Sequence, residues 1–219
     1  MKPENDELST EDHLKAQYMY WWRQWKRERR FKNSHYEYFF TEYFDIPKSF
    51  YEDRKVLDIG CGPRGSLEWM PDTASAVGLD PLAKEYARFG ISKHKAMYVD
   101  APAEKIPFPA ESFDCVSAFN SLDFVRSVED SVGEIKRILK AGGFFLLIVE
   151  INHKPRADAP HTISASDVES FGFEVLECRT FRKLEEKGCY HSILDEGNLA
   201  HNDGSAEMWL AAKLRKKAS

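Results

Sequence analysis

Hydrophobic residues in the first fifty positions recur every three to four residues, which is the spacing of one face of an amphipathic helix. The stripe runs through Leu14, Tyr18, Trp21 and Trp25. A second helix is expected to begin at Asn33 or Ser34, which are good capping residues, and to end before Pro47. About half of the aromatic residues of the chain lie in this segment, so residues 1–50 are expected to form an aromatic-rich helical cap.

Beyond residue 50 the period changes, and short apolar runs alternate with helical segments. The runs expected to form strands are 55–59, 74–80, 96–100, 113–120 and 143–151. The helices expected between them are 65–70, 82–89 and 127–140, with Gly142 and Gly143 ending the last one. This alternation predicts a parallel sheet with right-handed crossovers, and the near-continuous apolar run 143–151 predicts a central strand.

The last fifty residues are organised differently. A short helix is expected near 165–171, followed by two apolar runs at 173–184 and 206–214. The polar segment 185–204 between these runs shows no clear helix. Two strands that are joined without a crossover helix pair antiparallel. The sequence therefore predicts an α/β fold with a mostly parallel sheet of seven strands and an antiparallel C-terminal strand, formed by residues 51–219.

Composition narrows the class of protein. The chain has 219 residues, of which 42% are hydrophobic and 31% charged, and its net charge is -5. This balance fits one globular domain and argues against a protein that coats nucleic acid. No apolar run approaches the roughly 18–20 residues that cross a membrane, and the polar N-terminus does not resemble a signal peptide. We expect a cytoplasmic protein whose four scattered cysteines bind no metal and form no disulfide.

The segment Gly60-Cys61-Gly62-Pro63-Arg64-Gly65 satisfies the G-x-G-x-x-G pattern of nucleotide-binding loops. Asp80 follows about twenty residues later, where an acid accepts hydrogen bonds from ribose hydroxyls. Both features fit a dinucleotide, and both fit another nucleoside. Asp58 distinguishes between these two kinds of ligand, because a carboxylate two residues before the first glycine repels a pyrophosphate and attracts a cation. S-adenosylmethionine is such a ligand, with a sulfonium, an amino group and no phosphate.

Four segments in order resemble the class I S-adenosylmethionine-dependent methyltransferases, in particular the group of ubiquinone and menaquinone biosynthesis. They are VLDIGCGPRGSL, VGLDPL, AEKIPFPAESFDCVSAFNSLDFV and EIKRILKAGGFFLLIVE. The resemblance covers roughly residues 54–151 and implies a Rossmann-like sheet. The reversed strand pair expected at the C-terminus also fits the family.

The resemblance implies roles for individual residues. Asp58 and the backbone of the glycine loop would hold the methionine portion of the cofactor. Asp80 would bind the ribose hydroxyls, Leu82 would lie beside the adenine, and the Asn120 backbone would contact the amino group. The full set expected at the cofactor is Asp58, Gly60, Cys61, Gly62, Gly65, Asp80, Pro81, Leu82, Asp100, Ala103, Asn120 and Ser121.

The adenine contact departs from the family pattern. The family often reads Asp-Ala-Glu before the turn that here contains Ile106 and Pro107, but Pro102 stands in the place of the aspartate. The Ala103 backbone is therefore the first expected contact. Asp100 is the second, and it would reach the adenine amino group if the loop bends.

Acceptor sites in such folds lie at the carboxyl ends of the strands. The loop 152–164 follows the fifth expected strand directly, and we expect His153 or His161 to act there as a base or to orient the acceptor. An ordinary loop histidine is the alternative for each. No metal site is expected, because the histidines lack close ligand spacing.

The leading hypothesis is an enzyme that moves a methyl group from S-adenosylmethionine to an oxygen or nitrogen of a small molecule, leaving S-adenosylhomocysteine. The protein would act as a monomer or homodimer. Methylation of RNA is an alternative, because the run 22–32 is basic with interleaved aromatics. A regulatory protein that binds the cofactor without turnover is another. The location of Asp58 argues against a dinucleotide oxidoreductase.

Overall fold

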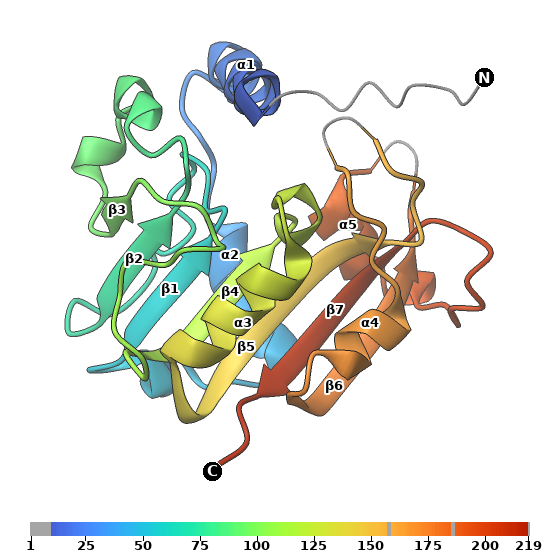
Figure 1. The fold of residues 1–219 in the computed structure, drawn as a ribbon. Helices are drawn as coiled ribbons and strands as arrows, with labels where there is room; N and C mark the ends of the chain where they lie inside the picture. Colours follow the sequence, from blue (N-terminus) through green and yellow to red (C-terminus); the bar gives the residue numbers. More distant parts are fainter. Residues whose placement is uncertain (1–9, 157–158, 185–186, 219) are drawn as a thin grey trace.

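A single seven-stranded sheet with the order β3-β2-β1-β4-β5-β7-β6 forms the centre of the protein (Figure 1). The computed structural model describes residues 10–156, 159–184 and 187–218. The strands are β1 Lys55–Ile59, β2 Ser75–Leu79, β3 Met97–Val99, β4 Phe113–Phe119, β5 Leu139–Ile151, β6 Glu174–Arg182 and β7 Met208–Arg215. Strands β1 to β5 are parallel to one another, and β7 is antiparallel to both β5 and β6. The predicted α/β sheet with a reversed C-terminal strand is confirmed.

Helices cover both faces of this sheet. The α-helices are α1 Thr10–Glu28, α2 His35–Phe40, α3 Val128–Ile138, α4 Ala165–Ser170 and α5 Cys189–Leu194. The 3-10 helices are η1 Glu42–Phe44, η2 Lys48–Tyr51, η3 Glu85–Phe89, η4 Ile91–Lys93, η5 Leu122–Phe124 and η6 Glu196–Asn198. In Figure 1, α3 and α4 lie in front of the sheet and α2 and α5 lie behind it.

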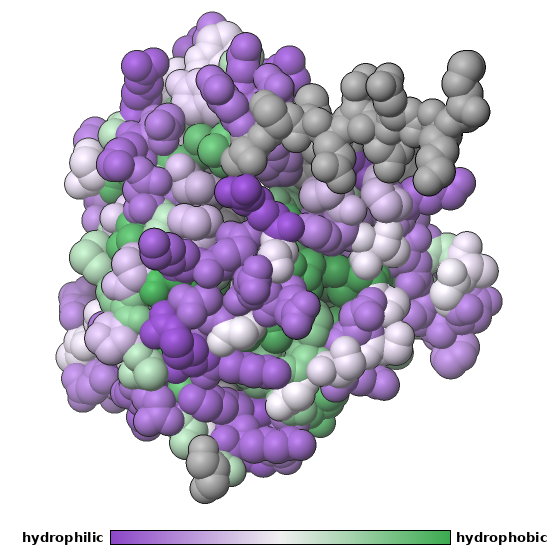
Figure 2. Space-filling view, in the orientation of Figure 1, coloured by the Kyte–Doolittle hydropathy of each residue, from purple (hydrophilic) through white to green (hydrophobic). Residues whose placement is uncertain are grey.

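The alternation of side chains along the strands divides the interior into two cores. In β1, Leu57 packs with α3 and α4 in one core, while Val56 packs with α2 and α5 in the other. β5 is buried from Phe145 to Ile151, as expected for a central strand. The outer surface of the α3 face is mostly hydrophilic, and hydrophobic residues show mainly in recesses near its middle (Figure 2).

The expected helix at 65–70 is absent, and the chain makes turns there instead. The segment begins with Gly65, whose φ of +77° does not fit an α-helix, and it is followed directly by Pro71. The turns place Leu67 and Met70 in the core behind the sheet.

The expected helix over 127–140 ends two residues early, at Ile138, because Leu139 already has extended backbone angles and begins β5. Gly142 and Gly143 therefore lie within β5, and they do not end the helix as we predicted. The φ angle of Gly142 is +74°, which only glycine adopts easily.

The segment 185–204 also differs from the prediction, because its described part contains α5 and η6. Its polar composition hid the short apolar face of α5, where Cys189 and Ile193 pack into the core behind the sheet.

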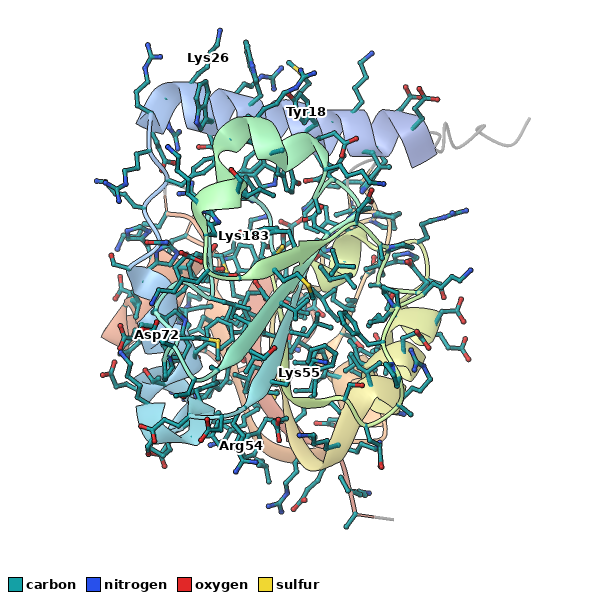
Figure 3. The ribbon with its side chains drawn as sticks, turned by 90° about the vertical axis from the view of Figure 1, so that its left-hand side faces the viewer. Tyr18, Lys26, Arg54, Lys55, Asp72 and Lys183 are labelled. Atoms are coloured by element: carbon teal, nitrogen blue, oxygen red, sulfur yellow. The ribbon has the colours of Figure 1, made fainter. Side chains whose placement is uncertain are left out.

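α1 lies apart from both cores, at the carboxyl-terminal edge of the sheet. Figure 3 shows it across the end of the molecule opposite Arg54 and Lys55, with Tyr18 and Lys26 on it. Its apolar side chains contact a separate small cluster of Leu82, Tyr86 and Ile91. Within the described residues, no helix is long and apolar enough to cross a membrane.

Candidate cofactor and acceptor site

The glycine loop begins where β1 ends, and its backbone leaves no room for side chains. Gly60 and Gly62 have φ angles of +63° and +55°. A Cβ on Gly60 would lie 2.4 Å from the Cβ of Ser121, and one on Gly62 would lie 2.5 Å from the ring of Trp21. The Gly60 N–H donates to the Leu79 carbonyl at 2.8 Å, which ties the loop to the end of β2. The loop is thus a tight cradle in which only glycine fits at positions 60 and 62, because Ser121 and Trp21 already fill the space that a side chain would need.

Asp58 points from β1 into the interior next to this cradle, and only 3% of it is exposed. Its carboxylate accepts hydrogen bonds from the hydroxyls of Ser66 and of Ser117, the latter at 2.6 Å. Burial raises the pKa of Asp58 to about 6, although the two serines oppose the shift. Ser66 and Ser117 were not among the predicted site residues, because serine is common in turns and strands.

Asp80 follows β2 and binds the backbone of two loops. Its carboxylate accepts from the Gly62 N–H at 3.1 Å and from the Leu82 N–H at 2.9 Å. Burial raises the pKa of Asp80 to about 6. The acid therefore holds the glycine loop in place.

These two acids make the site suitable for a cation. In the described part of the chain, no salt bridge reaches Asp58 or Asp80, and the charge of Asp80 adds to the raised pKa of Asp58. A buried carboxylate without a cationic partner is costly. A ligand that carries positive charge would lower this cost, whereas a pyrophosphate would raise it. The cradle and its acids fit S-adenosylmethionine.

The remaining predicted cofactor residues fall into two groups. Around the cradle, Cys61, Leu82, Ala103 and Ser121 are buried, and the Ser121 hydroxyl donates to the Ile59 carbonyl at 2.8 Å. Asn120 has a φ of +55° at the end of β4.

The other group lies toward the surface. Asp100 is exposed and pairs with Lys84 at 2.6 Å, and Pro81 is exposed. Gly65 faces the side chains of Glu68 and His94. The structure brings Asp58, Asp80 and the first two loop glycines together, and Asp100 lies near enough to Asp80 for its charge to raise the Asp80 pKa.

Comparisons with known proteins agree with this site. Residues 57–147 match the family model described as a methyltransferase domain. A fatty-acid O-methyltransferase of Mycolicibacterium smegmatis is 30% identical over 50% of this chain and 40% of its own length. A malonyl-[acyl-carrier protein] O-methyltransferase of Enterobacter lignolyticus is 34% identical over 41% of this chain and 36% of its own. The chain thus spans about two fifths of the length of these curated relatives.

The chain carries a class I S-adenosylmethionine-dependent methyltransferase domain. A solved methyltransferase of Haloferax volcanii, in complex with the activator Trm112, has the same fold, with a TM-score of 0.62 and 16% identity. That match covers 96% of this chain and 99% of the other. The predicted class and cofactor are confirmed, and the finer likeness to the quinone-biosynthesis group stays a prediction.

After the carboxyl ends of β4 and β5, His153 and Asp123 form a buried pair. Nε2 of His153 lies 3.6 Å from Oδ2 of Asp123, and neither side chain is more than 1% exposed. Nδ1 of His153 donates to the Lys154 carbonyl at 2.9 Å. The pair joins η5, after β4, to the loop after β5. Sequence reasoning missed Asp123, because nothing local relates it to a histidine thirty residues later.

His161 is half-buried, and its Nε2 donates to the Arg126 carbonyl at 3.1 Å. Both predicted histidines therefore lie beside the segment that follows β4. The described residues include no grouping of His, Cys, Asp or Glu that could hold a metal ion.

Aromatic residues from α2 and α5 meet behind the sheet near Asp58. The Tyr190 ring lies 4.8 Å from both His35 and Phe39, and 5.5 Å from Tyr36. Burial raises the pKa of Tyr36 and of Tyr190, and the Asp58 carboxylate adds to both shifts. Segments from the first and the last fifty residues of the sequence thus meet near Asp58.

Proposed function

We propose that this chain transfers the methyl group of S-adenosylmethionine to an oxygen or nitrogen atom of a small molecule. The observation that supports the proposal most strongly is the glycine cradle with two buried acids, Asp58 and Asp80. Bound there, the cofactor supplies an electrophilic methyl group on a good, neutral leaving group. The protein then has to position the acceptor in line and keep water out.

Two relatives support an oxygen acceptor, the fatty-acid and the malonyl-[acyl-carrier protein] O-methyltransferases, whereas other relatives are sterol C-methyltransferases. The names of the first two describe O-methylation of fatty acids and of malonyl groups on acyl-carrier protein. A carboxylate acceptor is already ionised at neutral pH and needs no base, whereas a hydroxyl acceptor of high pKa does. We infer that the acceptor is a small carboxylate or hydroxyl compound that enters beside η5.

We propose His153 as the residue that acts on the acceptor and Asp123 as its positioning partner. Since Asp123 and the Lys154 carbonyl flank the two ring nitrogens, the ring orientation is fixed. Both side chains are buried, so we propose that the acceptor approaches the pair at the carboxyl ends of β4 and β5, where η5 and the loop after β5 follow the strands. His161 is the second candidate.

The division into a cap over residues 1–50 and a catalytic domain over 51–219 is also a proposal. The two parts of the cap pack differently. α2 contributes Phe39 and Phe40 to the core behind the sheet, whereas the apolar side chains of α1 pack against the small cluster around Leu82. We therefore propose that α1 is the part that covers the site.

Thermal unfolding with S-adenosylhomocysteine, S-adenosylmethionine or a nicotinamide dinucleotide tests the ligand. A ligand at about 100 times its dissociation constant stabilises the native state by about 2.7 kcal/mol. We expect a rise in melting temperature with the two adenosyl compounds only. A rise with the dinucleotide alone would show that the role of Asp58 is misread.

His153→Ala and His161→Ala test the acceptor side. We expect either variant to slow methyl transfer about 10²–10⁴-fold with a hydroxyl acceptor if its histidine is the base, while the affinity for S-adenosylhomocysteine stays unchanged. The measurement is release of S-adenosylhomocysteine with a panel of carboxylate and hydroxyl acceptors. Full activity in both variants would show that neither histidine of this loop takes part in catalysis.

A further inference from the structure

The ring of Trp21, from α1, lies directly on the glycine loop. A Cβ on Gly62 would lie 2.5 Å from Cζ2 of this ring, so the ring contacts the second glycine of the cradle. Gly62 also donates its N–H to Asp80. The side chain that covers the loop therefore comes from a helix about forty residues earlier in the sequence.

An ion pair ties α1 to the same loop. Arg64, inside the glycine loop, donates from Nη2 to Oε1 of Glu28 at 2.7 Å and from Nη1 to Oε2 at 2.9 Å. The two side chains are only 16% and 18% exposed, so solvent screens this pair less than a surface pair. The Arg64 guanidinium also lies 5.6 Å from the Trp21 ring centroid and 5.0 Å from that of Phe31. Glu28 is the one acid in the basic run 22–32.

α1 extends from the cofactor side of the site to the acceptor side. Near its start, the ring of His13 lies 6.5 Å from that of Phe124 in η5, next to Asp123. Near its middle, Tyr18 stacks on Phe89 at 5.6 Å. Its apolar side chains are only half-buried, and it joins neither main core. α1 is thus held over the site by a few contacts rather than by deep burial.

We propose that Trp21 forms one wall of the cofactor site and that the Glu28–Arg64 ion pair holds it there. The inference rests on the proposed function, because the ligand in question is S-adenosylmethionine. α1 must lift from the loop before the cofactor can enter or the product S-adenosylhomocysteine can leave. When closed, it keeps water from the sulfonium and from the acceptor beside η5.

Other residues of α1 do not contact the glycine loop, and they can therefore serve as matched controls. Trp22 is next to Trp21, but it contacts the ammonium of Lys26, which lies 3.9 Å from its ring centroid. Glu11 is an exposed acid in the first turn of the same helix. Substitutions at these two positions change the composition of the helix equally and leave the wall and the ion pair intact.

Binding of S-adenosylhomocysteine to the full chain tests the proposal, by calorimetry for affinity and by stopped-flow displacement for the dissociation rate. We expect Trp21→Leu and Glu28→Gln each to raise the dissociation constant and the dissociation rate by about tenfold. This is the size of effect that the loss of one hydrogen bond to a charged group, or of a comparable packing contact, produces. Trp22→Leu and Glu11→Gln are expected to stay within about twofold of wild type. Trp21→Phe is expected to keep most of the affinity.

Unchanged or tighter binding in Trp21→Leu and Glu28→Gln would overturn the proposal, because the ring would then be irrelevant to the ligand or in competition with it. Circular dichroism of each variant separates loss of folding from loss of the wall, and Glu28→Gln keeps the size of the side chain. If wild type itself binds no S-adenosylhomocysteine, the proposed function fails. If wild type binds and the variants bind equally well, only this inference fails.

Discussion

Two buried carboxylates set the chemistry of the site at the scale of single residues. The pKa values of Asp58 and Asp80 are both raised from 3.8 to about 6 by burial. The two carboxyl groups therefore bind their protons more tightly in the native state than in the unfolded chain. From these two groups alone, stability of the free protein falls as pH rises from about 4 to about 6. Binding of a cation favours the ionised forms and has the opposite dependence.

We expect the affinity for S-adenosylmethionine to fall as pH is lowered through about 6, since protonated Asp58 attracts the cationic ligand less. Asp58→Asn should weaken binding at pH 7.5 and flatten this pH dependence. Calorimetric titrations between pH 5 and 8 check both expectations. An equally steep fall in the variant would mean that another group titrates.

Asp80→Ala is expected to weaken binding of S-adenosylhomocysteine by roughly 1–3 kcal/mol, through loss of the hydrogen bonds to the ribose hydroxyls. It also removes the acceptor of the Gly62 N–H, so the loop loses a tether. Asp72→Ala is the matched control, because Asp72 is an exposed acid paired with Lys95 and is not among the expected cofactor residues. Equal losses in both variants would contradict the assignment of the ribose site to Asp80.

Among the elements of the fold, the two N-terminal helices α1 and α2 differ in how deeply their aromatic residues are buried. Both carry an aromatic stripe at helical spacing, and the sequence predicted both. α2 places Phe39 and Phe40 at 0% exposure in the core behind the sheet, while the aromatic residues of α1 are half-buried at best. The stripe predicts a helix and its buried face, but it does not say which surface the face meets. The basic residues of the run 22–32 lie on the exposed side of this region.

Phe40→Ala is expected to destabilise the protein by about 3–5 kcal/mol, because it leaves a cavity against Tyr51, Trp69 and Phe119. Tyr20→Ala on α1, where the side chain is 49% exposed, should cost at most about 0.5 kcal/mol. Urea unfolding of the two variants measures the difference. A comparable loss at Tyr20 would show that α1 is as firmly packed as α2.

The whole molecule is a rigid sheet with two cores and a peripheral helix. β4 and β5 lie at the centre and are buried along most of their length. α1 depends on the small cluster around Leu82 and on its contacts with the glycine loop. Elements with few buried contacts open at lower free energy than the core.

Backbone amide hydrogen exchange should therefore be faster in α1 than in α3, and it should be slowest in β4 and β5. S-adenosylhomocysteine should protect α1 strongly and leave β5 unchanged, since closing α1 requires no change in the sheet. Mass spectrometry of peptides from the exchanged protein measures this. Protection of α1 as strong as that of β5 in the free protein would show that the helix does not open.

The sequence by itself determined the alternation of strands and helices, the reversed C-terminal strand, the glycine loop and the two acids beside it. These features depend on periods of two or 3.6 residues and on loop chemistry within a few positions. It also placed His153 and His161 after the fifth strand. The predictions for the short segments 65–70 and 185–204 were wrong, because the local pattern of a few residues does not determine whether they form a helix.

Only the tertiary structure decided which residues meet across the sheet. Glu28 with Arg64, Trp21 with Gly62, His153 with Asp123 and Tyr190 with α2 are pairs separated by about 30 to 150 residues. Each depends on how helices and loops from distant parts of the sequence pack together, and packing depends on shape and burial that no local pattern records. The cofactor loop could therefore be predicted from the sequence, and the helix that covers it could not.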